Sequence, residues 1–118
     1  MTYIKINDTL YPAFISGRNE DREWDNRESK AITLEMSYAD AMALFADDLD
    51  WAIVYQGDSY VDENGDTVTP EAEVYDNSEF SVAGPVTDNR NGTVTVKMGK
   101  ITAEEALTEL MEVLADEA

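Results

Sequence analysis

The sequence predicts one α+β domain, in which a mostly antiparallel sheet or small open barrel carries two amphipathic helices, at about residues 38–48 and 103–115, on one side. The chain of 118 residues has the length of a single domain, 1–118. Short segments of alternating apolar residues, separated by Asn, Asp and Gly, are typical of antiparallel strands joined by tight turns. Two other segments repeat apolar residues at helical spacing after a capping residue.

The N-terminal third predicts three strands. "TYIKIN" places Ile4 and Ile6 on one face of a strand, and the turn signal "NDT" predicts a hairpin whose second strand covers about residues 10–16. Residues 18–29 show neither helical nor strand periodicity, so we expect a long polar loop there. "KAITLEM" then alternates again and predicts the next strand.

The middle of the chain predicts the first helix and a projecting hairpin. Ser37 is a candidate N-cap, and Met42 and Phe45 belong to the apolar face of a helix over 38–48. "DWAIVYQ" predicts a buried strand. In "SYVDENGDTVTP", Asn64-Gly65 is a hairpin signal, and Pro70 with the acidic run behind it indicates that this hairpin projects or lies at a sheet edge.

The C-terminal third predicts a hairpin and a helix. "SEFSVAGPV" and "GTVTVKMG" read as two strands joined through "TDNRNG". Thr102 and Glu105 have the spacing of a capping box, which marks the start of the last helix. One apolar stripe follows on that helix, formed by Leu107, Leu110, Met111 and Leu114.

The charge of the chain limits the kinds of partner. Asp and Glu number 26 and Lys and Arg number 8, which gives a formal net charge of −18. Such a charge repels phosphates and anionic lipid surfaces and attracts basic protein surfaces. We therefore expect protein partners and neither direct nucleic-acid binding nor membrane binding. The plainer interpretation is that the acidity provides only solubility.

Catalysis is not expected. The chain has no Cys and no His, which excludes thiolate and imidazole zinc sites and every nucleophile that is activated by histidine. "DENGD" resembles a calcium loop, but Tyr60 stands where the first carboxylate ligand would be, and a hairpin turn explains the same residues. No carboxylate pair stands out among so many. We expect a protein that is not an enzyme, with no cofactor and no metal.

Two groups of residues are candidates for a protein interface. The first lies in the expected loop, where Trp and Arg are the residue types most enriched among binding hot spots; it consists of Arg18, Arg22, Trp24 and Arg27. The alternative is that Trp24 folds back as a lid on the core while Arg22 and Arg27 pair with acids of the loop.

The second group is acidic. Carboxylates at a helix C-terminus oppose the helix dipole, so their presence there is either tolerated in solvent or serves a basic partner. This candidate acidic patch combines residues at the C-terminal end of the first helix with residues of the projecting hairpin: Asp47, Asp48, Asp50, Asp58, Asp62, Glu63 and Asp66.

The segments "ISGRNEDREWDNRESKAITLEM", "NSEFSVAGPVTDNRNGTVTVKMGK" and "TAEEALTELMEVL" resemble a family of short uncharacterised proteins encoded by phages and prophages of Gram-positive gut bacteria. The resemblance implies a phage-encoded protein that is made in the bacterial cytoplasm, with incorporation into the virion as one outcome. It implies no catalytic residues.

Two functions remain open. One is a small virion structural protein of the tail or baseplate, or an assembly factor, whose partners are copies of itself as a homo-oligomer or other phage proteins. The other is an acidic DNA mimic, of the anti-CRISPR or anti-restriction type, whose partner is a basic nucleic-acid-binding enzyme.

Overall fold

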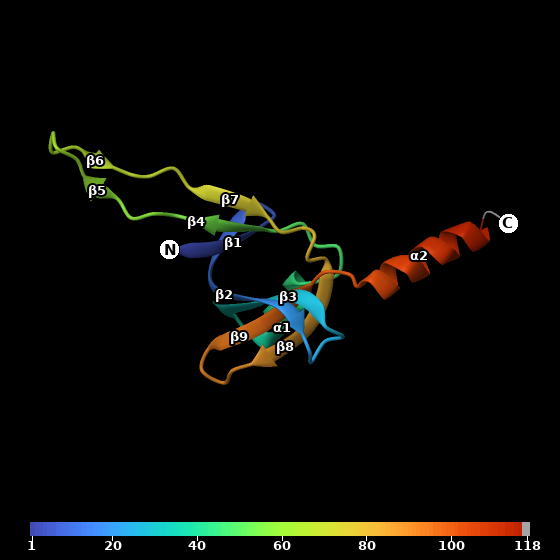
Figure 1. Cartoon of the computed structure of the whole chain (residues 1–118). Helices are drawn as coiled ribbons and strands as arrows, with labels where there is room; N and C mark the ends of the chain where they lie inside the picture. Colours follow the sequence, from blue (N-terminus) through green and yellow to red (C-terminus); the bar gives the residue numbers. More distant parts are fainter. Residues whose placement is uncertain (117–118) are drawn as a thin grey trace.

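The computed structural model describes residues 1–116, which form an α+β fold built on an open antiparallel sheet (Figure 1). The main sheet has seven strands in the order β7-β4-β1-β2-β3-β9-β8, and β5 and β6 form a separate two-stranded sheet. The elements are β1 (Thr2–Ile6), β2 (Thr9–Asp21), β3 (Arg27–Glu35), α1 (Tyr38–Leu44), β4 (Ala52–Tyr55), β5 (Tyr60–Val61), β6 (Thr67–Val68), β7 (Glu73–Asp76), β8 (Val82–Asp88), β9 (Thr93–Gly99) and α2 (Ala103–Asp116).

The long strand β2 connects two halves of the main sheet. Its first residues pair with β1, up to Tyr3↔Pro12, and the following residues pair with β3, from Ala13↔Leu34 onward. Strands β1 and β4 in one half and strands β3 and β9 in the other contribute to a single hydrophobic cluster. The core therefore lies between the two halves. Its largest fully buried members are Ile4, Ile6, Ile32, Val94, Val96, Met98 and Phe80.

The hairpin turns confirm the turn signals of the sequence. Asn7 and Asp8, between β1 and β2, have φ of 51° and 64°, and Gly65, at the β5–β6 turn, has φ of 81°. These left-handed conformations suit Gly, Asn and Asp far better than other residues. The predicted strands at "DWAIVYQ" and on both sides of "TDNRNG" are also present, as β4, β8 and β9.

The expected loop over residues 18–29 is wrong. Strand β2 continues to Asp21 and β3 starts at Arg27, so that only residues 22–26 form the connecting turn. The end of β2 is exposed on both faces up to residue 20 and contains a register shift between Arg18 and Asp21. A strand that is wet on both faces has no apolar alternation, which is why its sequence resembles a loop.

Helix α1 is shorter than predicted and buries a different face. Ser37 caps it by accepting a hydrogen bond from the Asp40 N–H at 3.1 Å, but the helix has 7 residues and ends at Leu44. Ala41 is fully buried against β8 and β9, and Phe45, the C-cap residue, is 5% exposed. Met42 is 53% exposed, so its predicted place on the buried face is wrong.

Two projections extend from the body in opposite directions, the hairpin β5–β6 and the helix α2 (Figure 1). They give the molecule a length of 69 Å against 35 and 26 Å in the other dimensions. Of the two positions that the sequence predicts for this hairpin, projecting or at a sheet edge, the structure has the first. The expectation that both helices cover one side of the sheet holds for α1 only, because in the part of the chain described α2 does not lie along the sheet and is attached to it through the side chain of Glu105 in its first turn. Strand β7, a fully exposed edge strand, was not predicted.

Candidate protein-interaction surface

Helix α2 begins with a complete capping box. The Thr102 backbone N–H donates to Glu105 Oε1 at 2.8 Å, and the Glu105 backbone N–H donates to Thr102 Oγ1 at 3.2 Å. These bonds satisfy two donors that a helix start otherwise leaves open. The hydrogen bond from Thr102, followed by that from Arg27, holds the pKa of Glu105 below its ordinary value. The sequence predicted this cap correctly.

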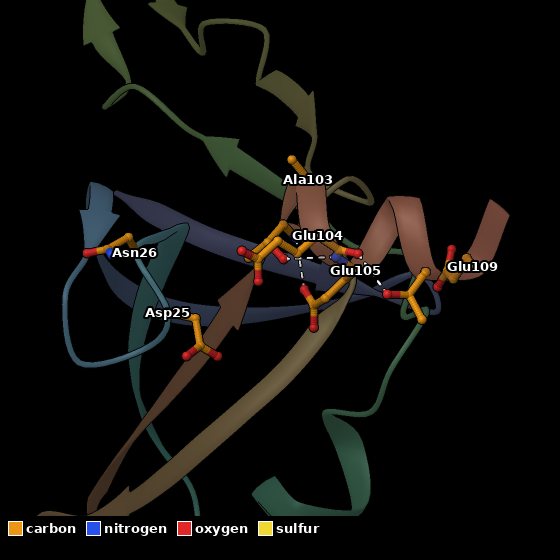
Figure 2. A pocket seen from close by; sticks show the side chains of 8 residues that line it. Asp25, Asn26, Ala103, Glu104, Glu105 and Glu109 are labelled. Atoms are coloured by element: carbon orange, nitrogen blue, oxygen red, sulfur yellow. Dashed lines mark hydrogen bonds between the residues drawn. The ribbon is translucent and has the colours of Figure 1, made fainter. Parts of the chain in front are cut away.

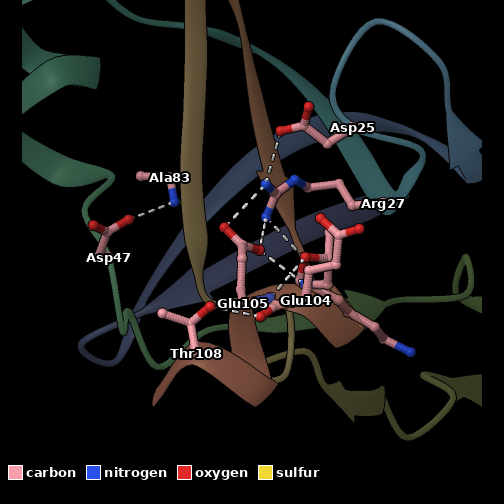
Figure 3. Close-up of polar contacts among 9 residues, drawn as sticks. Asp25, Arg27, Asp47, Ala83, Glu104, Glu105 and Thr108 are labelled. Atoms are coloured by element: carbon pink, nitrogen blue, oxygen red, sulfur yellow. Dashed lines mark hydrogen bonds and ion pairs between the residues drawn. The ribbon is translucent and has the colours of Figure 1, made fainter. Parts of the chain in front are cut away.

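Arg27 ties the first turn of α2 to the sheet (Figure 3). Its Nη1 and Nη2 donate to the two carboxylate oxygens of Glu105 at 2.8 and 3.2 Å, and Nη1 also donates to the Lys100 carbonyl at 3.1 Å. Asp25 lies 3.5 Å from Nη2. A bidentate pair fixes orientation as well as distance. Because Arg27 is only 5% exposed, its guanidinium is occupied inside the protein.

The Arg27 guanidinium also contacts the indole ring of Trp24. The Arg27 guanidinium carbon lies 4.6 Å from the centre of the indole, in cation–π geometry. The indole packs on two glycines, since a Cβ at Gly84 would lie 2.5 Å from Trp24 Cη2 and one at Gly99 would lie 2.8 Å from Cζ3. Only a residue without a side chain permits this close approach. Trp24 is half-buried over β8 and β9.

Asp21 precedes the turn that carries Trp24 and accepts hydrogen bonds that hold this turn in place. Its carboxylate is fully buried and accepts hydrogen bonds from Lys97 Nζ at 2.8 Å and Ser29 Oγ at 3.0 Å. The bond from Lys97 is the main reason that the pKa of Asp21 is lowered despite burial. A second contact across the same turn is the Asn26 N–H donating to the Asp21 carbonyl at 2.9 Å. The turn is therefore a rigid platform under the start of α2.

The polar face of α2 is turned toward this platform. A cavity of about 880 Å³ lies between the 22–26 turn and the helix (Figure 2). Its lining consists of polar residues and one alanine: Asp25, Asn26, Thr102, Ala103, Glu104, Glu105, Thr108 and Glu109. At 3.6 residues per turn, Glu105, Glu109 and Glu112 lie opposite the apolar stripe. The stripe therefore points away from the body.

Every side chain of α2 from residue 103 to 115 is exposed. Leu107 is 57% exposed, Leu110 55%, Met111 61% and Leu114 57%. An amphipathic helix in a globular protein normally turns its apolar stripe to the core. Here the attachment through the polar face leaves the α2 stripe, defined as Leu107, Leu110, Met111 and Leu114, as a free apolar ridge.

The predicted Arg and Trp group is dispersed by the structure. Trp24 and Arg27 are committed to the α2 platform, as described above. Arg18 is exposed and lies 3.8 Å from Asp21. Arg22 is exposed and forms no ion pair among residues 1–116. The Trp24 part of the alternative agrees with this arrangement, because the indole lies on Gly84 and Gly99 of the sheet. Of its two arginines only Arg27 pairs with an acid of the segment, Asp25, among the described residues.

The predicted acidic patch is divided into two parts. Asp47, Asp48 and Asp50 precede β4, whereas Asp58, Asp62, Glu63 and Asp66 follow it, on the projecting hairpin. Asp47 accepts a hydrogen bond from the Ala83 N–H at 2.8 Å, and Asp62 accepts from the N–H groups of Asn64 and Asp66, both at 2.9 Å. These two carboxylates stabilise local structure.

Two apolar surfaces were missed from the sequence. One is the exposure of the α2 stripe, for which the sequence has no signal, because a covered and an uncovered stripe have the same periodicity. The other is an apolar groove of about 670 Å³ beside Phe14, which is 72% exposed. The alternation of β2 could have found Phe14, since Ala13 and Ile15 pack against the core and Phe14 points to the opposite face.

Among the described residues, no cluster of three or more Asp and Glu is arranged to hold a metal ion, and neither helix has the length and apolar character needed to cross a membrane. Comparisons of the chain with protein-family models, with curated proteins and with solved structures found no match.

Proposed function

We propose that the chain is a non-enzymatic interaction protein, a small structural or assembly-associated protein of a phage tail or baseplate, which binds another protein through the α2 stripe. The observation that supports this proposal is the inverted attachment of α2. Arg27 holds the helix by its polar side at Glu105, while Leu107, Leu110, Met111 and Leu114 stay exposed.

The energetics support a partner for this stripe. Full burial of a Leu or Met side chain contributes roughly 1.5–3 kcal/mol, so four of them represent a substantial gain for any protein that covers them. The platform of Trp24, Arg27 and Asp21 fixes the start of the helix before binding. Such preorganisation lowers the entropic cost of association.

The alternative function, an acidic DNA mimic, is favoured by the charge of −18 and by the hairpin segment, which has no Lys or Arg between residues 56 and 76. A mimic needs carboxylates in one array, whereas Asp47 and Asp62 are engaged by backbone N–H groups in separate parts of the molecule. Inhibition of a nuclease that weakens steeply with salt, and that is lost on replacing Asp47, Asp48 and Asp50 with Lys, would favour mimicry over assembly.

The test of the assembly function is the composition of phage particles. Mass spectrometry of purified particles and assembly intermediates should find the chain at a fixed copy number. Leu110→Asp should reduce its incorporation at least tenfold, because the charge breaks the apolar contact. Met42→Asp is the matched control: Met42 is 53% exposed on the other helix, and its variant should be incorporated normally. Absence of the chain from both particles and intermediates would contradict the proposal.

A further inference from the structure

The main sheet ends in two edge strands, β8 and β7, which differ in how well they can accept a further strand. β8 contains Pro85, and its pairing with β9 has a register shift beside that proline. Proline and such irregularities are devices by which proteins prevent another strand from adding to a sheet edge. β7 has no proline and pairs with β4 in unbroken register over all of its 4 residues. The edge at β7 therefore has the regular geometry that an added strand requires.

Half of the backbone groups of β7 point away from β4. In an antiparallel pair, residues whose N–H and C=O face the partner strand alternate with residues whose groups face outward. The Asn77 N–H donates to the Trp51 carbonyl at 2.8 Å, which fixes the phase of this alternation. Tyr75, two residues away, therefore also faces β4, whereas Val74 and Asp76 direct their N–H and C=O outward. Among residues 1–116 no strand pairs with that outer side of β7.

Both faces of β7 carry exposed side chains that an added strand would contact. Val74 is 57% exposed on one face, and Tyr75 is 51% exposed on the other. The Tyr75 ring packs edge to face on Tyr55 of β4, with the ring centres 5.6 Å apart, and its hydroxyl donates to Glu73 Oε2 at 3.2 Å. Aromatic rings beside a carboxylate can hold both the apolar stem and the charged end of a Lys or Arg side chain.

Two hollows flank this aromatic pair, one near each end of β7. Tyr55 lines both, and their volumes are about 350 Å³ and about 330 Å³. The carboxylates that line them are Glu71 and Glu73 in the first hollow and Asp76 and Glu79 in the second. The cations in the same linings are already engaged, because the N-terminal ammonium donates to the Gln56 carbonyl and Lys30 donates to Asn77 Oδ1. Each hollow can therefore take a basic side chain of an added strand.

The charge around β7 determines which kind of strand the edge can accept. Residues 56–76 contain seven Asp and Glu residues and no Lys or Arg. Charged side chains on an edge strand discourage unwanted pairing. Because they are all acidic here, they repel an acidic strand, and they repel a second copy, which brings an identical edge and a net charge of −18. The same charges attract a strand that carries Lys or Arg.

We propose that an extended basic segment of another protein adds to the main sheet as a strand along the outer edge of β7. Backbone hydrogen bonds to Val74 and Asp76 supply affinity, and alternating side chains supply specificity, with Lys or Arg on the face of Tyr75 and an apolar residue on the face of Val74. A contact over 4 residues is small, so we expect weak binding that depends on salt. β7 and the α2 stripe lie in different parts of the molecule (Figure 1), so this inference does not depend on the stripe.

The test is an NMR titration of the full chain with a capped peptide of alternating lysine and valine residues. Binding at the edge should slow hydrogen exchange of the Val74 and Asp76 amides at least tenfold, whereas the Tyr75 amide, which already faces β4, should change little. The affinity should fall at least tenfold between 0.1 M and 1 M NaCl, where the screening length drops from about 10 Å to about 3 Å. No chemical-shift change at about 1 mM peptide, where even weak binding is visible, would contradict the proposal.

A fully N-methylated form of the same peptide separates strand addition from charge attraction alone. It keeps every side chain and charge but has no N–H donor for the β7 carbonyls, so it should bind at least tenfold more weakly. Equal binding of the two peptides would overturn the proposal, because the surface would then be an acidic patch to which no strand adds. Protection of the Val74 and Asp76 amides that grows with protein concentration, without peptide, would overturn it as well, since a second copy would then occupy the edge.

Variants of β7 test the edge from the side of the protein. Val74→Pro removes an outward N–H and no hydrogen bond to β4, a position at which edge strands tolerate proline, and it should weaken peptide binding at least tenfold. Val74→Ala keeps the N–H and should stay within threefold of the wild type. Glu73→Gln should weaken binding about threefold, whereas Glu109→Gln, the same change on α2, should have no effect. Unchanged binding by Val74→Pro would contradict strand addition, and if circular dichroism shows that this variant is unfolded, the N-methylated peptide decides.

Discussion

The two helices are capped alike at their N-termini, but one is packed against the sheet and the other is exposed to solvent. Both α1 and α2 are capped by a hydroxyl, from Ser37 and Thr102, and both carry apolar residues at helical spacing. Helix α1 has 7 residues and buries Ala41 against the sheet, whereas α2 has 14 residues and buries no side chain between 103 and 115. An amphipathic pattern therefore indicates that a helix has an apolar face, but it does not indicate whether the protein's own sheet or another surface covers that face.

The difference arises where each helix is attached. Phe45, directly after α1, enters the core and draws the helix onto β8 and β9. At α2 the attachment is Glu105, on the polar face, which is bound by Arg27. One apolar anchor thus makes a helix part of the core, and one polar anchor presents a helix to solvent.

The largest expected effect is a difference in the free energy of unfolding between a variant beside α1 and a variant in α2. Phe45→Ala should lower the free energy of unfolding by about 3–5 kcal/mol, because it leaves a cavity in the core. Leu110→Ala should change it by no more than about 0.5 kcal/mol, because Leu110 is exposed in the monomer. Urea denaturation at a concentration that keeps the chain monomeric measures both. A loss of several kcal/mol for Leu110→Ala would show that α2 packs on its own body in solution.

The local features of this fold could be predicted from sequence, and the long-range ones could not. Turns at Asn7-Asp8 and Asn64-Gly65 depend on residues that tolerate left-handed φ, and the cap at Thr102 depends on a neighbour three residues away. The pair of Arg27 with Glu105 joins residues 78 positions apart. No local pattern carries that contact, so the anchor that turns α2 outward was not predictable.

The wrongly predicted loop has a different cause, which is solvent exposure. The end of β2 and all of β7 are exposed on both faces, so hydrophobic alternation, the main strand signal, is missing from them.

The site was predicted in part, because Arg27 and Trp24 were singled out by residue type alone. Their packing depends on Gly84 and Gly99, two glycines whose role appears only when β8 and β9 lie beneath the indole.

The next effect tests the platform under α2. Gly84→Ala places a Cβ 2.5 Å from the indole of Trp24, so the ring must move, and we expect a loss of about 1–3 kcal/mol of stability together with a red shift of Trp24 fluorescence. Gly17→Ala is the matched control, because its Cβ would meet no atom within 4 Å. That variant should be neutral or stabilised by roughly 0.4–1 kcal/mol. Equal losses in both variants would mean that the indole does not rest on Gly84.

The smallest effect concerns the polar anchor itself and its dependence on pH. The pKa of Glu105 lies below its ordinary value of 4.5, because its carboxylate accepts hydrogen bonds from the Thr102 N–H and from Arg27. A lowered pKa in the folded state means that the anchor contributes fully above about pH 4.5 and is lost as the pH falls through that lowered value. The side chain of Glu105 is 44% exposed, so solvent screening keeps the contribution below about 1 kcal/mol.

Acidification should therefore loosen α2 before the body unfolds. NMR relaxation of the α2 amides, recorded from pH 6 down to about 3, should show increasing motion of the helix relative to the sheet as Glu105 takes up a proton. Glu105→Gln should show that motion already at pH 6 and little change below it, since the charged pair is absent. Glu109→Gln, on the same face but without a hydrogen bond to the body among the described residues, should behave like the wild type. If Glu105→Gln instead keeps the wild-type pH dependence, the Arg27–Glu105 pair is not what holds the helix in its outward position.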